Sequence, residues 1–207
     1  MYKRQVNGLL KRGKFIVIEG IDQSGKKTQS LLLKNRLKKK GYKVGYISFP
    51  KYNTTIGKLV RKCLRDDKIS VEISHILLSA NRWEAENEIR QLLEEMDFLV
   101  CNRYRDSNIA YGLANGLNKK WLENLDLGLP KQDLTIFIDI PITESVIRKT
   151  ENRDRYERNK KFLNNVKSKY INLANKNRWF KIKGDRSKDE VSNEIWRIVE
   201  RKYKIKK

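Results

Sequence analysis

Short runs of consecutive apolar residues alternate along this chain with longer segments whose apolar residues recur every three or four positions. The short runs are bounded by glycine, proline or polar residues, and they predict strands at 15–18, 44–49, 98–101, 133–140 and 179–182. Unbroken apolar runs of this length are typical of strands that are buried on both faces of a parallel sheet.

The segments with helical periodicity lie between these strands. They predict helices at 28–40, 55–64, 71–95, 143–148, 162–173 and 188–203. Alternating strands and helices predict an α/β fold with a parallel five-stranded sheet that is covered by helices on both faces. No repeat, linker or break in composition divides the chain, so residues 1–207 are expected to form a single domain.

Ligands of such folds bind beyond the carboxyl ends of the strands. The loops that follow Ile18, Phe49, Cys101 and Ile140 should therefore meet in one crevice. Candidate functional residues are expected in these loops.

The loop after the first strand has the spacing Gly-x-x-x-x-Gly-Lys, from Gly20 to Lys26. This spacing is typical of a phosphate-binding loop, because glycine allows backbone N–H groups to wrap a phosphate closely and the next helix directs its positive end at the anion. An ordinary strand-to-helix turn is the alternative. The predicted ATP- and phosphate-binding residues are Gly20, Gln23, Ser24, Gly25, Lys26, Lys27 and Thr28.

Lys27 occupies a position that normally carries Ser or Thr, whose hydroxyl binds Mg²⁺. An ammonium group has three donors and no acceptor, so it cannot bind a metal ion. Thr28 cannot simply replace the missing hydroxyl, because adjacent residues of a helix point about 100° apart.

Composition narrows the function further. The formal net charge of +22 suits anionic partners, including nucleic acid, but Lys and Arg are scattered over every segment, which favours nucleotide substrates over a nucleic-acid-binding arm.

With a single histidine, His75, metal sites built on histidine and Ser-His-Asp chemistry lose most of their support. The distant Cys63 and Cys101 do not form a zinc motif, and free thiols indicate a reducing, cytoplasmic setting. No apolar stretch approaches the roughly 20 residues needed to span a bilayer.

Several segments occur in the order and spacing of one known family: GIDQSGKKTQ, FPKYNTTIGK, HILLSANRWE, NRYRDSNIAYG, GLPKQD and RDRYE. The chain resembles the thymidylate kinases from about Gly13 to Trp196, most specifically in Leu78–Glu84 and in the loop that begins at Asn102. The resemblance implies a P-loop nucleoside-monophosphate kinase fold in three layers, with a short lid at about 149–161. It also implies transfer of a phosphoryl group from ATP to dTMP with Mg²⁺, and a homodimer.

The resemblance further implies roles for individual residues. The catalytic cations would be Lys26, Arg103, Arg153 and Arg155, and Arg148 would bind ATP. The dTMP site would comprise Asp22, Phe49, Leu78, Arg82, Arg103, Ser107, Tyr111 and Tyr156. Simpler alternatives are a solvated carboxylate for Asp22, a surface arginine for Arg82, a helix N-cap for Ser107 and a solvated charged segment for 149–161.

The chain departs from the family pattern at several positions besides Lys27. Asn102 replaces the acidic residue expected at the metal, although its amide oxygen can still bind an ion or a water. Leu78 replaces an aromatic residue that stacks on the base, which weakens stacking by about 0.5–1.5 kcal/mol. Tyr52 replaces an arginine, and Asn108 replaces a glycine. Many members also have an arginine at Gln23, and here that role would pass to the lid.

These departures leave a second hypothesis open beside the dTMP kinase. The chain would then be a degenerate relative that binds a nucleotide, or a polyanion such as RNA, without efficient turnover. A different P-loop enzyme, such as a deoxynucleoside kinase, is the remaining alternative.

Overall fold

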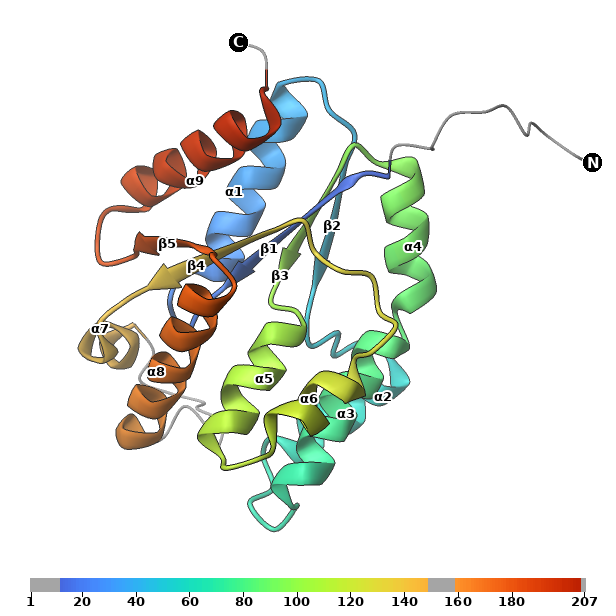
Figure 1. The fold of residues 1–207 in the computed structure, drawn as a ribbon, viewed down its shortest axis with the longest axis vertical. Coiled ribbons are helices and arrows are strands. Elements are labelled where there is room, and N and C mark those ends of the chain that lie inside the picture. The colour runs from blue at the N-terminus through green and yellow to red at the C-terminus, as the bar shows by residue number, and fades with distance from the viewer. Residues whose placement is uncertain (1–11, 149–158, 206–207) are drawn as a thin grey trace, which may run out of the picture.

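A parallel sheet of five strands forms the centre of the chain in the computed structural model, which describes residues 12–148 and 159–205 (Figure 1). The strands lie in the order β2-β3-β1-β4-β5, and every neighbouring pair is parallel. The strands are β1 (Lys14–Glu19), β2 (Val44–Ser48), β3 (Phe98–Asn102), β4 (Leu134–Asp139) and β5 (Phe180–Lys183). The predicted fold class is confirmed, and all five predicted strands are present within two residues of their expected bounds.

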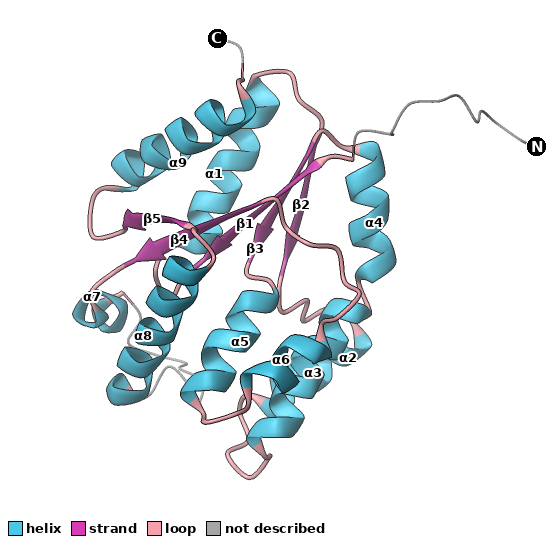
Figure 2. Ribbon diagram, viewed as in Figure 1, coloured by secondary structure: helices cyan, strands magenta, loops and turns pink. Residues whose placement is uncertain are grey.

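Helices cover both faces of this sheet (Figure 2). The helices are α1 (Lys26–Lys39), α2 (Thr55–Cys63), α3 (Val71–Trp83), α4 (Glu86–Glu95), α5 (Arg105–Ala114), α6 (Lys119–Leu125), α7 (Ile142–Ile147), α8 (Lys160–Lys176) and α9 (Lys188–Tyr203). None of the helices in the described ranges is long and apolar enough to cross a membrane.

One prediction was wrong: the expected helix at 71–95 is two helices. α3 ends at Trp83, and α4 begins after Ala85, whose backbone (φ −100°, ψ 7°) leaves the helical region. The two helices have different environments. α4 buries Ile89 and Leu93 against the sheet, whereas the buried side chains of α3 are polar and bond mainly to α2, to α5 and to Asp126 after α6.

The short helices α5 and α6 were not predicted, and their sequences explain why. α5 begins with the polar residues Arg105-Asp106-Ser107-Asn108, and two of them, Asp106 and Asn108, are buried where Gln132 and His75 supply hydrogen-bond partners. The first turn of α5 therefore lacks the apolar periodicity that would indicate the start of a helix.

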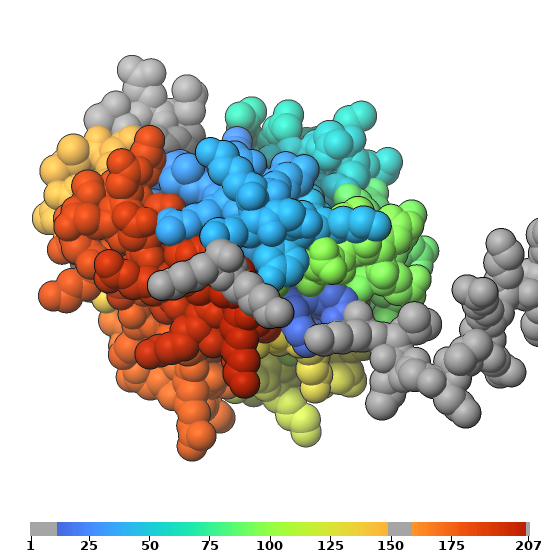
Figure 3. All heavy atoms as spheres, turned by 90° about the horizontal axis from the view of Figure 1, so that it is seen from above, coloured from blue at the N-terminus to red at the C-terminus, as the bar shows by residue number. Residues whose placement is uncertain are grey.

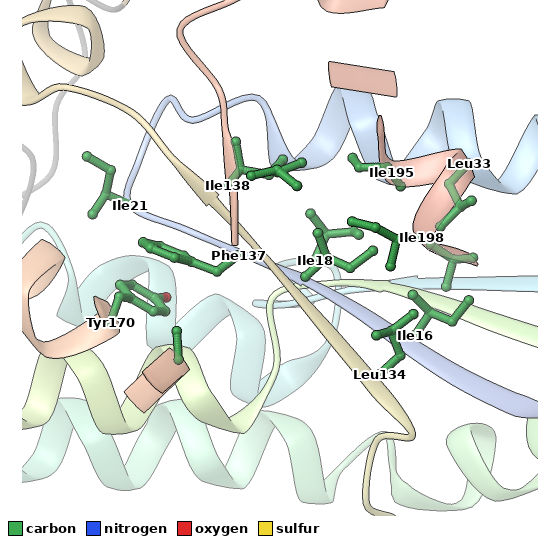
Figure 4. Packing of buried hydrophobic residues seen from close by; sticks show 14 of the residues in the cluster. Ile16, Ile18, Ile21, Leu33, Leu134, Phe137, Ile138, Tyr170, Ile195 and Ile198 are labelled. Atoms are coloured by element: carbon green, nitrogen blue, oxygen red, sulfur yellow. The ribbon is translucent and has the colours of Figure 1, made fainter. Parts of the chain in front are cut away.

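The core lies on both sides of β1, whose side chains alternate between the two faces. Ile16 and Ile18 belong to the larger cluster with Leu33 of α1, and Figure 4 shows Ile198 of α9 next to them. Phe15 and Val17 belong to a second cluster with α4. Figure 3 shows α1 in blue and α9 in red side by side at the surface of the molecule.

The register of the strands sets the position of the site. Ile18 of β1 and Ser48 of β2 are both level with Asn102 at the end of β3. Glu19 is level with Phe137 of β4. The loops that follow these strands therefore meet at one edge of the sheet, as the sequence predicted.

Candidate active site

The loop between β1 and α1 has the backbone of a phosphate-binding loop. Gly20 has a φ of 156°, and a Cβ atom there would lie 2.5 Å from Ser24 Oγ and 2.7 Å from the Ile138 carbonyl oxygen. Gly25, with a φ of 86°, occupies the N-cap position of α1 in the left-handed conformation. Both positions require glycine, so the two glycines of the motif are explained by backbone geometry alone.

Lys26 lies over this loop at the first position of α1. Its ammonium group donates to the carbonyl oxygen of Ile21 and to Ser24 Oγ at 3.3 Å, and the residue is 6% exposed. The cation is therefore held at the place where the outer phosphates of a nucleotide would bind.

Asp22 projects from the same loop and joins it to α5. It forms an ion pair with Arg103 and accepts a hydrogen bond from the Tyr111 hydroxyl. Burial raises the pKa of Asp22, but the charges of Arg103 and Lys26 and the bond from Tyr111 outweigh it and lower the pKa below its ordinary value. Asp22, whose side chain is 23% exposed, is thus a carboxylate held in place by two partners.

Arg103 has a left-handed backbone (φ 62°) immediately after β3, and its N–H donates to the Ile18 carbonyl at 3.1 Å. Its guanidinium donates to Ser107 Oγ at 3.1 Å and to the Tyr170 hydroxyl at 3.3 Å. Burial opposes the charge, yet the neighbouring Asp22 carboxylate keeps the pKa of Arg103 well above its ordinary value. A permanent cation therefore lies at the centre of the crevice.

Glu19, which the sequence analysis missed, anchors these groups from below. It is 0% exposed and accepts hydrogen bonds from Tyr104 N at 2.8 Å, Ser107 Oγ at 2.6 Å and the Tyr170 hydroxyl at 3.0 Å. An acidic residue at the end of an apolar strand, directly before Gly20, was the signal available in the sequence. The alternative of a helix N-cap for Ser107 was wrong, because Ser107 lies inside α5 and Tyr104 occupies the cap position.

A small, largely apolar pocket of about 110 Å³ opens beside Arg103. Arg82 lines it and is not a surface arginine: it is 3% exposed, with Nε and Nη2 bonded to the Asp126 carboxylate at 3.0 and 2.8 Å. The described lining comprises Asp22, Phe49, Pro50, Tyr52, Leu64, Leu78, Arg82, Arg103, Tyr104, Ser107, Asn108 and Tyr111. The predicted base- and sugar-binding residues that the structure describes are thus brought together.

Besides Leu78, two further departures from the family pattern, Asn108 and Tyr52, lie in this lining. Asn108 is paired with His75, through a 2.6 Å contact between Oδ1 and Nδ1 and a 3.2 Å bond from Nδ2 to the His75 carbonyl. Tyr52 lies under the guanidinium of Arg61, 5.0 Å from the ring centroid. Both residues are therefore fixed by neighbours within the chain.

A second, larger pocket of about 630 Å³ surrounds the phosphate-binding loop. Arg148 borders it and donates to the carbonyl oxygens of Gln23 at 3.3 Å and Gly184 at 3.1 Å. Its described lining comprises Asp22, Gln23, Ser24, Gly25, Lys26, Lys27, Thr28, Gln29, Asn102, Arg103, Arg148, Gly184, Arg186, Lys188 and Val191. Among these residues six are cations and one is a carboxylate, as expected for a site that binds a polyphosphate.

The fit of this pocket to Mg²⁺ can be judged from Asn102. Its Nδ2 donates to Ser48 Oγ at 2.9 Å, whereas its Oδ1 is buried and has no hydrogen-bond partner among the described residues. A buried, unpaired amide oxygen suits an ion or an ion-bound water. Within residues 12–148 and 159–205 no group of three or more His, Cys, Asp and Glu side chains could hold a metal. The site therefore fits an ion held mainly by the oxygens of the nucleotide.

Part of the expected site lies outside the described residues. Arg153, Arg155 and Tyr156, together with 149–158 of the expected lid, belong to this part. The last residues of the expected lid, 159–161, are the N-cap and first residues of α8.

The strand order, the phosphate-binding loop and the two adjoining pockets define a P-loop nucleotide kinase. The sequence profile of thymidylate kinase matches residues 18–195, and the chain belongs to the thymidylate kinase family. The thymidylate kinase of Plasmodium falciparum is 38% identical over 191 residues, which cover 91% of this chain and 90% of the relative. The human thymidylate kinase is 36% identical over 149 residues, which cover 71% of this chain and 70% of the relative. The solved thymidylate kinase from Candida albicans superposes with a TM-score of 0.80 and 34% identity, and the match covers 94% of each chain.

Proposed function

We propose that this chain transfers the γ-phosphoryl group of ATP to dTMP and releases ADP and dTDP. The observation that carries the proposal is that the phosphate-binding pocket and the apolar pocket share Asp22 and Arg103. A donor triphosphate in the larger pocket and an acceptor monophosphate in the smaller one would therefore meet at the Arg103 guanidinium. The thymidylate kinase relatives identify the acceptor as dTMP.

The reaction needs positioning and charge stabilisation from the protein more than it needs a base. An oxygen of the dTMP phosphate, already ionised, attacks the γ-phosphorus, and the bond from that phosphorus to the bridging oxygen of ADP breaks. Lys26 would stabilise the outer phosphates of ATP, and Arg103 would bind the phosphate of dTMP. Because both cations are held by hydrogen bonds within the chain, little reorganisation accompanies the reaction.

The remaining roles follow from the lining of the two pockets. Asp22, fixed by Arg103 and Tyr111, would accept a hydrogen bond from the sugar hydroxyl of dTMP. Leu78 and Phe49 would contact the base, and Arg82 would face its edge. Arg148 would bind ATP phosphates. Roles for Arg153, Arg155 and Tyr156 in closing the site remain predictions from the resemblance.

Mg²⁺ is part of the proposal as the ion that neutralises the phosphates of ATP when it is bound. Asn102 is the described residue whose free oxygen would hold it, directly or through a water. Lys27 would not.

We propose a homodimer that associates through α2 and α3. Large apolar side chains are exposed there: Leu59 by 47%, Ile73 by 48%, Ile76 by 41% and Trp83 by 41%. An exposed apolar group of this kind is typical of a protein–protein interface. The single-domain organisation and the cytoplasmic location stay predictions, the latter supported by the two buried free cysteines.

The test is direct identification of the product. Purified chain would be incubated with ATP, Mg²⁺ and one acceptor at a time, either dTMP, dUMP or the ribonucleotide UMP, and the diphosphates would be separated by chromatography. The proposal expects dTDP and ADP in equal amounts, with dTMP the best acceptor. A folded chain that converts none of these acceptors would contradict it.

The degenerate alternative predicts binding without turnover. Neither the described site nor the comparisons provide an observation that favours it. Its nucleic-acid form predicts that affinity for RNA falls steeply with salt, because contacts to phosphates release counterions. Binding to RNA that is absent or insensitive to salt would remove that form.

A further inference from the structure

Lys27 lines the phosphate pocket and is exposed at the second position of α1. In the phosphate-binding loop this position usually carries the hydroxyl that binds Mg²⁺. The side chain that replaces it is a cation, and it lies in the same pocket as the unpaired oxygen of Asn102. The ammonium group repels a divalent cation and attracts the phosphates that this cation would otherwise bridge.

The other charges of the pocket act in the same direction. Five further cations line it, and Asp22 is the one carboxylate among its described lining residues. Three of the five cations form ion pairs: Arg103 with Asp22, Arg148 with Glu144 and Arg186 with Glu194. The six cations of the described lining thus still exceed the three carboxylates that pair with them. ATP without Mg²⁺ carries more negative charge than its Mg²⁺ complex, so a lining with this excess of cations gains more from binding the uncomplexed form.

No described hydroxyl takes over the metal-binding position. Ser30, one turn along α1, donates its hydroxyl to the Lys27 carbonyl at 2.9 Å and does not line the pocket. Ser24 accepts a hydrogen bond from the Lys26 ammonium. Thr28 also lines the pocket, but it follows Lys27 in the helix and is therefore rotated by about 100° from the metal-binding position.

We infer that Lys27 replaces Mg²⁺ as a charge partner of the ATP phosphates, so that this chain binds ATP almost as tightly without Mg²⁺ as with it. The inference rests on the proposed function, since it concerns the ATP site of that reaction. It concerns nucleotide binding and not the transfer step.

Calorimetric titration of ATP into the whole chain tests this inference, because no acceptor is present and no turnover occurs. One titration is made with Mg²⁺ and the other with excess chelator. The wild type should show dissociation constants within about threefold of each other. In Lys27→Thr, which restores the hydroxyl, Mg²⁺ should tighten ATP binding by about tenfold or more, and affinity in chelator should fall by about tenfold.

Two control variants test whether the effect depends on a positive charge and on its location at residue 27. Lys27→Arg retains the cation and should behave as the wild type. Lys34→Thr removes the same charge from α1 outside the pocket, where Lys34 lies over the Tyr46 ring, and it should also leave both constants unchanged. Circular dichroism melting of each variant checks that it is folded.

The other outcomes distinguish this inference from the proposed function. A wild type that binds ATP only with Mg²⁺, or a Lys27→Thr variant whose constants match the wild type, would overturn the inference and leave the kinase proposal intact. A folded wild type that binds no ATP under either condition would overturn both.

Discussion

At the scale of single residues, the Asp22 carboxylate is the group on which the two pockets depend. It holds the Arg103 guanidinium on one side and the Tyr111 hydroxyl on the other, and it lines both pockets. Its depressed pKa keeps it ionised throughout the neutral range. A neutral side chain of the same shape would leave a buried cation without its counter-charge.

The variant Asp22→Asn should therefore bind dTMP poorly and position its phosphate badly. We expect kcat/KM for dTMP to fall by about 10- to 100-fold, with a smaller effect on the KM for ATP. Steady-state kinetics with each substrate varied in turn measures the difference. Glu123→Gln, at an exposed ion pair with Lys119, is the control that should change neither constant. An unchanged kcat/KM in Asp22→Asn would contradict the role given to this carboxylate.

Asp106 makes a prediction about pH. Burial raises its pKa to about 7, and Gln132 donates a hydrogen bond to its Oδ2. Because the folded pKa lies above the unfolded one, the folded state binds the extra proton, and stability is lost as pH rises from about 4 to about 7.

Asp106→Asn removes this titration, so the variant does not lose this stability as pH rises. Its free energy of unfolding minus that of the wild type should therefore be larger at about pH 8 than at about pH 5, by up to a few kcal/mol. Urea unfolding of both proteins at the two pH values measures it. A difference between the proteins that does not change with pH would show that Asp106 has an ordinary pKa.

At the scale of elements, α3 is positioned by a buried ion pair. Arg82 on α3 bonds to Asp126 at the end of α6, and Ser79 Oγ also donates to Asp126 at 2.7 Å. Asp126 is 1% exposed. The orientation of the Arg82 guanidinium in the apolar pocket thus depends on a second helix.

Asp126→Ala should destabilise the chain by about 3–5 kcal/mol, because it leaves the buried Arg82 without a partner. Glu123→Ala breaks the exposed ion pair between Lys119 and Glu123 on α6 and should lower the free energy of unfolding by less than about 1 kcal/mol. Urea unfolding of the two variants gives the comparison. Equal effects would mean that the Arg82–Asp126 pair contributes no more than a surface pair.

The sequence predicted some elements of the fold correctly and missed others. All five strands and the phosphate-binding loop could be predicted, because apolar runs and glycine spacing are local signals. The break at Ala85, the helix α5 and the role of Glu19 could not. Both α5 and Glu19 depend on polar partners that are distant in sequence. Glu19, for example, meets Tyr170 151 positions further along the chain.

The candidate site also has a part that the sequence predicts and a part that it does not. The loops that contain Asp22, Lys26 and Arg103 follow strands directly, so parallel topology alone predicts that they meet. Their pairing was not predictable. The sequence gives no indication that Arg103 bonds to Asp22, or that Asp126 fixes Arg82, since neither pair is close along the chain.

At the scale of the whole molecule, the proposed dimer depends on the exposed apolar residues of α2 and α3. Ile76→Glu should disrupt it, because a buried, unpaired carboxylate at an interface is costly. Size-exclusion chromatography with light scattering should give about twice the chain mass of 24.6 kDa for the wild type and a single chain mass for the variant. A wild type that is monomeric at all concentrations would contradict the proposed dimer.

The cationic pocket and the net charge of +22 have a common interpretation in this account. Both reaction partners are polyanions, and a basic molecule attracts them over longer distances than contact pairs do. The charge therefore needs no separate nucleic-acid partner.

The measurement that tests the central claim most directly is the turnover number with ATP, dTMP and Mg²⁺. Three proteins are compared: the wild type, Lys26→Ala and Lys34→Ala, which removes a lysine from the same helix outside both pockets. The account predicts a wild-type kcat in the range of about 1–100 s⁻¹, a loss of about 100-fold or more in Lys26→Ala and no loss in Lys34→Ala. A folded wild type that forms no more dTDP than Lys26→Ala would contradict it.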